Sequence, residues 1–269
     1  MPSSNPAFRG LGGAGNGQQT APWGAQPRYG APTQDHYAAP SPYAATGTQY
    51  MTMDDVVTKT GLTFLVTVLA AAATWMAVPD TTAIGLLFPA LIVGLVLGLV
   101  ISFKQVTNPV ATLAYAALQG VVVGGISELY NDNFGGNIVT QAVIGTFGVF
   151  FGMLVVYKTG AIRVTPKLTR WIVGALFGVL ALSIVNLLAS FFVDGGLGLR
   201  DGGPLAILFS LVVIGVAAFS LLLDFDMADE AIRRGAPAKF AWYIAFGLLV
   251  TVVWLYLEML RLLSYLQSE

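Results

Sequence analysis

From Thr60 onward, long apolar stretches alternate with short segments that hold most of the charged side chains. Each stretch is about 20 residues long, so a helix rising about 1.5 Å per residue would cross a hydrocarbon core of about 30 Å. The pattern predicts an all-α integral membrane protein with seven spanning helices. The predicted spans are residues 60–78, 82–103, 109–129, 138–157, 171–193, 204–225 and 240–264.

The composition excludes several classes of function. Hydrophobic residues make up 56% of the 269 residues and charged residues only 10%, whereas soluble domains carry about a quarter charged residues. The 13 basic and 14 acidic residues nearly cancel, so no basic surface for nucleic acid is expected. Cysteine is absent, and the single histidine, His36, lies outside the predicted spans. We therefore expect neither an enzyme nor a bound cofactor, and the lipid bilayer as the principal partner.

Residues 1–51 differ from the remainder of the chain. They are rich in Gly, Pro, Ala, Gln, Ser and Tyr and show no apolar periodicity. Such a composition is typical of a disordered tail, which here precedes a membrane domain over residues 52–269. At the junction, Thr52 is followed three residues later by Asp55, a spacing that can cap the first turn of a helix.

The distribution of lysine and arginine predicts the orientation. With the tail in the cytoplasm, eleven basic residues fall on the inside, and only Arg200 and Arg261 fall on the outside or near it. This bias favours a cytoplasmic N-terminus in the cytoplasmic membrane and, after seven spans, an external C-terminus. The eleven residues are Arg9, Arg28, Lys59, Lys104, Lys158, Arg163, Lys167, Arg170, Arg233, Arg234 and Lys239.

Pairs of glycines four residues apart recur within the predicted spans. Each pair leaves two spots without a side chain on one helix face, where another backbone can approach closely. Packing within the bundle is the favoured interpretation, and a dimer interface is the alternative. The pairs are Gly94 and Gly98, Gly120 and Gly124, Gly148 and Gly152, and Gly174 and Gly178.

A few acids lie within or at the ends of apolar sequence, where an unpartnered carboxylate costs several kcal/mol. Asp224 and Asp226 end the sixth span and could be a solvated helix exit that faces Arg233. Glu258 lies inside the seventh span, and Arg261 one turn later could form an ion pair with it. Alternatively, Glu258 meets a sixth-span aspartate, and the two carboxyls share one proton. Such a pair would respond to pH, and its oxygen atoms would be suitable ligands for transient binding of Ca²⁺.

The segments LLLDFDMADEAIRRGAP and WLYLEMLRLLSYL, with QGVVVGGISE in the third span, resemble the Bax-inhibitor family, including its bacterial YccA-like proteins. The similarity covers roughly residues 52–266. It implies six helices around a central seventh, and a pH-sensitive calcium leak channel whose gate is a carboxylate pair. Asp226 matches the sixth-helix acid of that pair and Glu258 the seventh-helix acid. YccA-like relatives also suggest an alternative, a non-conducting adaptor that modulates a membrane protein such as a protease.

Three features depart from the family pattern. The seventh-helix acid is Glu258 where many relatives have Asp, and Asp226 is followed by Met-Ala where Thr-Gln is usual. Asp224 also competes for the sixth-helix role. In addition, the turn near Gly235 lies about 10 residues after Asp226 but about 22 before Glu258, which separates them by roughly 18 Å in two straight antiparallel helices. Contact between the acids therefore requires an extra helix, for example over 227–238, or staggered helices.

Overall fold

The computed structural model describes residues 49–267 apart from 78–79, 136 and 194–195. The chain divides into two units, Met1–Ala45 and Thr46–Glu269. The first unit, and with it most of the predicted disordered tail, lies outside the described residues.

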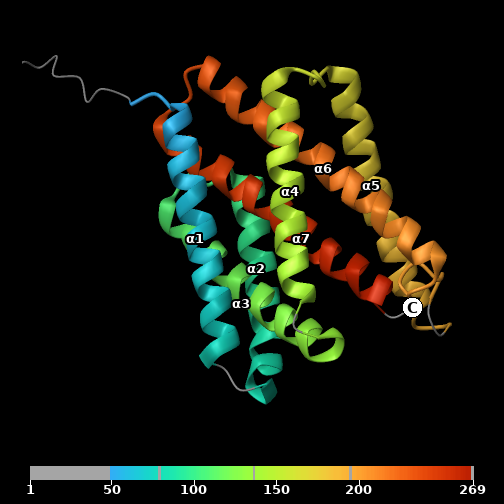
Figure 1. Ribbon diagram of the computed structural model, residues 1–269. Helices are drawn as coiled ribbons and strands as arrows, with labels where there is room; N and C mark the ends of the chain where they lie inside the picture. Colours follow the sequence, from blue (N-terminus) through green and yellow to red (C-terminus); the bar gives the residue numbers. More distant parts are fainter. Residues whose placement is uncertain (1–48, 78–79, 136, 194–195, 268–269) are drawn as a thin grey trace, which may run out of the picture. The chain divides into compact units, whose positions relative to one another are not determined.

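Eight helical segments make up the described part of the second unit (Figure 1). All seven long helices are apolar enough to cross a membrane, which confirms the predicted seven-span plan. The segments are α1 (Met53–Ala77), α2 (Asp80–Lys104), α3 (Pro109–Phe134), α4 (Ile138–Thr159), α5 (Pro166–Ala189), α6 (Pro204–Arg233), the short 3-10 helix η2 (Ala238–Phe240) and α7 (Ala241–Gln267).

The helix ends differ from the predicted spans because polar contacts, rather than hydropathy, set them. α1 begins at Met53, seven residues before the predicted span, because Asp55 N–H donates to Thr52 Oγ1 at 3.2 Å and Thr52 N–H donates to Asp55 Oδ2 at 3.1 Å. This is the expected cap. α5 likewise begins at Pro166, where the side chain of Thr165 accepts a hydrogen bond from the Leu168 N–H.

α6 continues to Arg233 rather than ending at 225. Its last turns carry two ion pairs at a spacing of four residues, Asp229 with Arg233 and Glu230 with Arg234. No separate helix forms over 227–238, so the extra helix that contact between the two acids would have required is not found there. The connection is a short turn into η2 instead.

α7 is the central helix, as the family resemblance implied. It packs against α1, α3, α4 and α6, and in Figure 1 it runs (red) diagonally behind α1 and α4. In the most apolar stretch of α7, 61% of the residues are buried, a larger share than in any other span. Polar groups along α7 are therefore shielded from lipid by the surrounding helices.

The close approach of α3 to α1 depends on glycine. A Cβ added at Gly120 or Gly124 would lie 2.5 Å from a backbone oxygen of α1, at Thr67 and Ala71 respectively. Thr67 Oγ1 also donates to the Ala116 carbonyl of α3 at 3.2 Å. Packing within the bundle thus explains this glycine pair, whereas a Cβ at Gly148, Gly152, Gly174 or Gly178 would meet no atom within 4 Å.

The segment before α1 is anchored to the α6–α7 connection. Met51 N–H donates to the Ala236 carbonyl and Ala238 N–H donates to the Gln49 carbonyl, both at 2.7 Å. Lys59 Nζ also donates to the Ala238 carbonyl at 2.7 Å, and Met51 is only 2% exposed. Ordered structure therefore begins at least three residues before the predicted boundary at 52.

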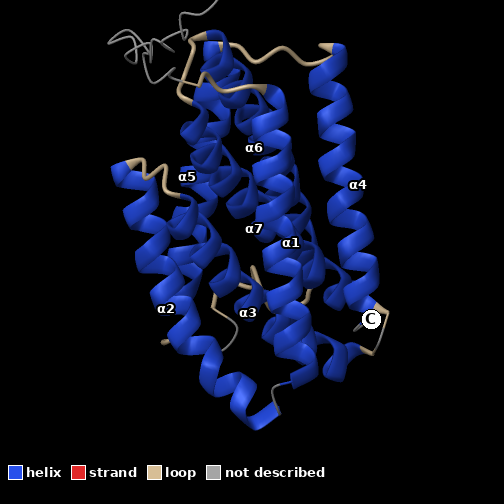
Figure 2. Ribbon diagram, turned by 90° about the vertical axis from the view of Figure 1, so that its left-hand side faces the viewer, coloured by secondary structure: helices blue, strands red, loops and turns tan. Residues whose placement is uncertain are grey.

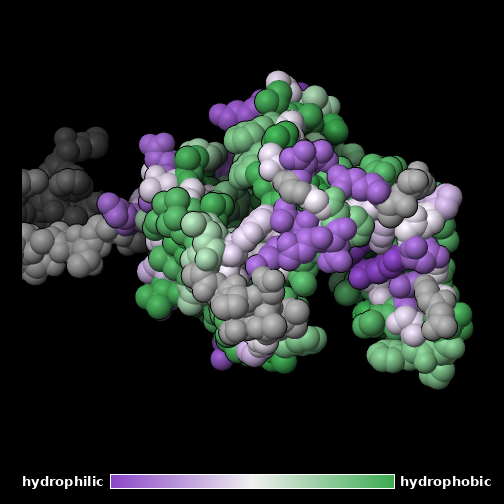
Figure 3. Space-filling model, turned by 60° about the horizontal axis from the view of Figure 1, so that its bottom comes forward, coloured by the Kyte–Doolittle hydropathy of each residue, from purple (hydrophilic) through white to green (hydrophobic). Residues whose placement is uncertain are grey.

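The surface of the bundle suits a bilayer. Large apolar side chains are exposed on most helices, among them Phe88, Phe103 and Phe177. Viewed from below, hydrophilic side chains gather on the face turned to the viewer, while hydrophobic ones dominate the flanks (Figure 3). The start of α1 and the end of α7 lie at opposite ends of the bundle, as an odd number of spans requires (Figures 1 and 2).

Candidate functional site

Glu258 lies on the central helix, is 2% exposed and uses both carboxylate oxygens. Ser210 of α6 donates its hydroxyl to Glu258 Oε1 at 2.7 Å. Arg261, one turn further along α7, donates from Nη1 to Glu258 Oε2 at 2.5 Å. The structure thus forms the ion pair that the sequence offered as one of two alternatives.

Asp224 finds a different partner on α7. Thr251 donates its hydroxyl to Asp224 Oδ2 at 2.7 Å. Both residues border a cavity of about 230 Å³ that also includes Ser102 of α2 and Tyr243 of α7. This contact provides a hydrogen bond for the Asp224 carboxylate but no neutralising cation.

Asp226 belongs to the charged end of α6. Its electrostatic neighbours are Arg233, Glu230 and Asp229, and Tyr157 of α4 lies beside it. The Tyr157 hydroxyl donates to Asp229 at 3.2 Å. The surroundings match the simpler of the two sequence interpretations, a polar helix exit that faces Arg233.

The structure does not bring Glu258 together with either aspartate. The α7 partner of Asp224 is Thr251, seven residues before Glu258, which corresponds to about 10 Å along the helix axis. Asp226 lies further along α6, toward the turn into η2. The cause is the unequal number of residues that separates each acid from the turn near Gly235. Because α6 continues without a break to this turn, Asp226 stays close to the turn while Glu258 lies far from it along α7.

A small cavity adjoins Glu258 and contains a second arginine. Its volume is about 120 Å³, and Arg200, Glu258, Arg261 and Ser183 are among its lining residues. Partial burial and then the nearby Arg261 guanidinium lower the pKa of Arg200, while Glu258 acts in the opposite sense. Two guanidinium groups thus face one carboxylate, which leaves a net charge of +1 at this site.

Sequence reasoning did not assign Arg200 or Ser210 to the site. Arg200 is the only basic residue that the predicted orientation places in an outside connection, and this isolation was the one available signal. Ser210 carried no comparable signal, because a serine in an apolar span commonly bonds within its own helix, as Ser220 does to the Val216 carbonyl.

The sequence model of the Bax inhibitor 1 like family matches residues 5–268. The chain belongs to this family. The match includes most of the N-terminal segment, which the sequence resemblance had left out. A search among curated proteins found no match.

For this Bax inhibitor 1 like chain, the described residues contain no group of three or more His, Cys, Asp or Glu side chains that could hold a metal ion. The transient Ca²⁺ site expected at Asp226 and Glu258 would need both carboxylates in contact with one ion. Here Arg261 already neutralises Glu258. A cation could use Glu258 only after Arg261 moves away.

Proposed function

We propose that the chain is a pH-sensitive passive cation leak of the cytoplasmic membrane, with the N-terminus in the cytoplasm and Ca²⁺ as the conducted ion. The observation that carries the proposal is a carboxylate, 2% exposed, on the central helix beside a cavity of about 120 Å³. Buried ionisable groups in membrane helices commonly mark ion or proton pathways. Family membership supports the same class of function, and the choice of Ca²⁺ comes from the family resemblance.

The gate in this proposal is the Glu258–Arg261 pair rather than a pair of acids. Arg261 is 24% exposed at its side chain, and a long flexible side chain can swing away from a partner on its own helix. While the pair is closed, the site has a net charge of +1 and repels cations. When Arg261 moves out, Glu258 and Ser210 offer oxygen ligands of the kind that Ca²⁺ prefers.

The sign of the pH dependence follows from the same charges. Protonation of Glu258 raises the net charge of the site from +1 to +2, because Arg200 and Arg261 stay charged. Cations are then repelled more strongly, and no carboxylate is left to bind them. Acidification therefore favours the closed state.

Calcium flux into vesicles that contain the full chain and a calcium dye tests the gate. Glu258→Gln should lower the flux and remove its pH dependence, whereas Arg261→Gln should raise the flux because it frees the carboxylate. Asp226→Asn is the matched control and should behave like the parent chain, since Asp226 lies at the other end of α6. A Glu258→Gln protein with unchanged flux and unchanged pH response refutes the proposal, as does flux no greater than in protein-free vesicles.

The alternative is an adaptor that restrains another membrane protein. The observation in its favour is the basic connector, residues 158–170, which includes the end of α4, the turn and the start of α5. It holds four exposed basic residues that belong to none of the ion pairs formed among the described residues, Lys158, Arg163, Lys167 and Arg170. Co-purification of a membrane protein that depends on this connector or on residues 1–50, from a chain without ion flux, would favour the adaptor.

A further inference from the structure

α5 stands apart from the other helices. Among the long helices only α6 packs against it beyond isolated contacts, and that contact is small, so most of its surface faces outward. Trp171 is 71% exposed and Phe177 is 68% exposed. A Cβ added at Gly174 or Gly178 would meet no atom within 4 Å. No other described part of the chain therefore covers this face of α5.

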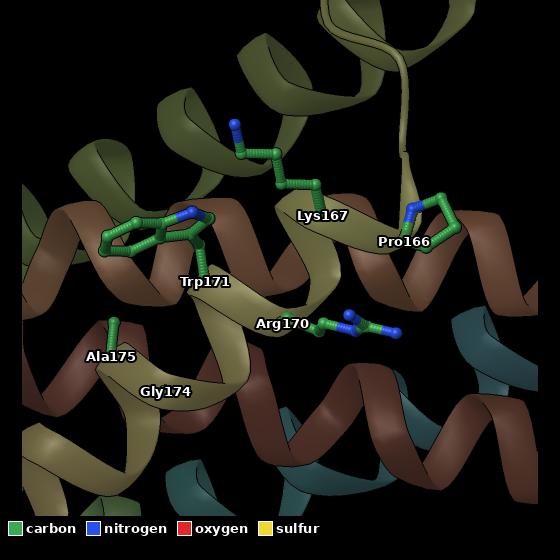
Figure 4. Close-up of a pocket in the computed structure, with 6 residues that line it drawn as sticks. All are labelled: Pro166, Lys167, Arg170, Trp171, Gly174 and Ala175. Atoms are coloured by element: carbon green, nitrogen blue, oxygen red, sulfur yellow. The ribbon is translucent and has the colours of Figure 1, made fainter.

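An open cavity of about 740 Å³ lies on this face at the N-terminal end of α5 (Figure 4). It combines two chemically different halves. Lys167 and Arg170 bring positive charge to the end of the helix, while Trp171, Gly174 and Ala175 continue along the apolar part. In Figure 4, the side chains of Lys167 and Trp171 lie on the same side of the helix, whereas the side chain of Arg170 extends in another direction. A Cβ at Gly174 would meet no atom within 4 Å.

No acidic residue is among those that line this cavity. None of the ion pairs formed among the described residues includes Lys167 or Arg170. Between Lys158 and Trp171 the sequence contains four basic residues and no acidic residue. A ligand that fits must therefore bring negative charge to one end of the cavity.

We propose that this cavity binds an anionic phospholipid from the adjacent leaflet. Its phosphate would contact Lys167 and, after rotation of the long exposed side chain, Arg170, and an acyl chain would run past Trp171 along the open surface at Gly174. Basic pockets at the ends of spanning helices bind such headgroups, and tryptophan commonly lies at the level of the headgroups. Free phosphate would use only the basic half, whereas a phospholipid uses both. The proposal does not depend on ion conduction.

Native mass spectrometry of the purified full chain tests the site, with phosphatidylglycerol and phosphatidylcholine of identical acyl chains as the probes. The double substitution Lys167→Gln and Arg170→Gln should weaken phosphatidylglycerol binding about 30-fold, since each basic residue near a headgroup contributes about 1 kcal/mol. The matched control is Lys104→Gln with Lys239→Gln, which removes two exposed charges on the same predicted side but away from the cavity. The control should bind phosphatidylglycerol as the parent chain does.

A second variant separates a defined site from diffuse charge attraction. Gly174→Leu keeps every charge and fits into open space, yet it fills the apolar half of the cavity. It should also weaken phosphatidylglycerol binding.

Each of the following results would overturn the proposal: equal binding of phosphatidylcholine, an equal loss in the control pair, normal binding by Gly174→Leu, or full competition by glycerol 3-phosphate. If the double variant binds phosphatidylglycerol normally, the proposal also fails, and the basic connector is left as a surface for a protein partner.

Discussion

The contact between α1 and α3 gives a stability prediction whose size can be taken from the structure. In Gly124→Ala, the new methyl group would lie 2.5 Å from the Ala71 carbonyl oxygen and 2.9 Å from the Ala71 Cα. Both are backbone atoms within α1, so a side-chain rotation cannot relieve the clash and the two helices must separate. Overpacking of this kind costs about 1–3 kcal/mol.

The matched control is Gly148→Ala, in α4. It makes the same chemical change in a helix interior, but a Cβ at Gly148 meets no atom within 4 Å. Alanine is the better helix former by roughly 0.5–1 kcal/mol, so the control should be at least as stable as the parent chain.

Unfolding of both variants in the same detergent, followed by tryptophan fluorescence, measures the difference. We expect Gly124→Ala to be less stable than Gly148→Ala by about 1–3 kcal/mol, the overpacking cost alone, because the gain in helix propensity is the same in both variants and cancels. Equal stability of the two variants would refute the inference that glycine at 124 is required for the approach of α3 to α1.

Two further predictions concern the polar contacts of α7. Arg261→Leu should destabilise the chain by about 3–5 kcal/mol because it removes the cation that is hydrogen-bonded to the buried Glu258 carboxylate, and adding Glu258→Leu should recover most of that loss; equal instability of the single and double variants in denaturant unfolding would contradict this. Thr251→Val should cost about 1–2 kcal/mol because Asp224 loses its hydrogen bond, whereas Thr74→Val, which removes a bond within α1 only, should cost less in the same assay.

Hydropathy predicted the number of spans but not where the helices end. The apolar runs located all seven, because only a helix satisfies its own backbone groups within lipid. Helix ends, in contrast, depend on side-chain contacts that average hydropathy does not contain. The ion pair of Asp229 with Arg233 continues α6 by about two turns beyond the apolar run, and the Thr165 cap starts α5 five residues before it.

The candidate site was predictable only in part. Glu258 was identifiable because an acid in the middle of an apolar span needs a partner, and Arg261 was identifiable because residues three apart on a helix are neighbours. Arg200 reaches the cavity from the connection between α5 and α6. The path of such a connection is set by tertiary packing, and no periodicity in the sequence encodes it.

The register of α6 and α7 explains why Glu258 has a hydroxyl as its partner on α6. Ser210 lies 25 residues before Gly235 and Glu258 lies 23 after it, so the two are nearly level in an antiparallel helix pair. Asp226 lies only 9 residues before Gly235, which is too close to the turn to be level with Glu258. The same numbers of residues from the turn that argued against contact between two acids thus place Ser210 beside Glu258. Ser210 brings a hydrogen bond but no charge to Glu258, and the cation that pairs with the carboxylate comes from α7 itself, one turn further along, at Arg261.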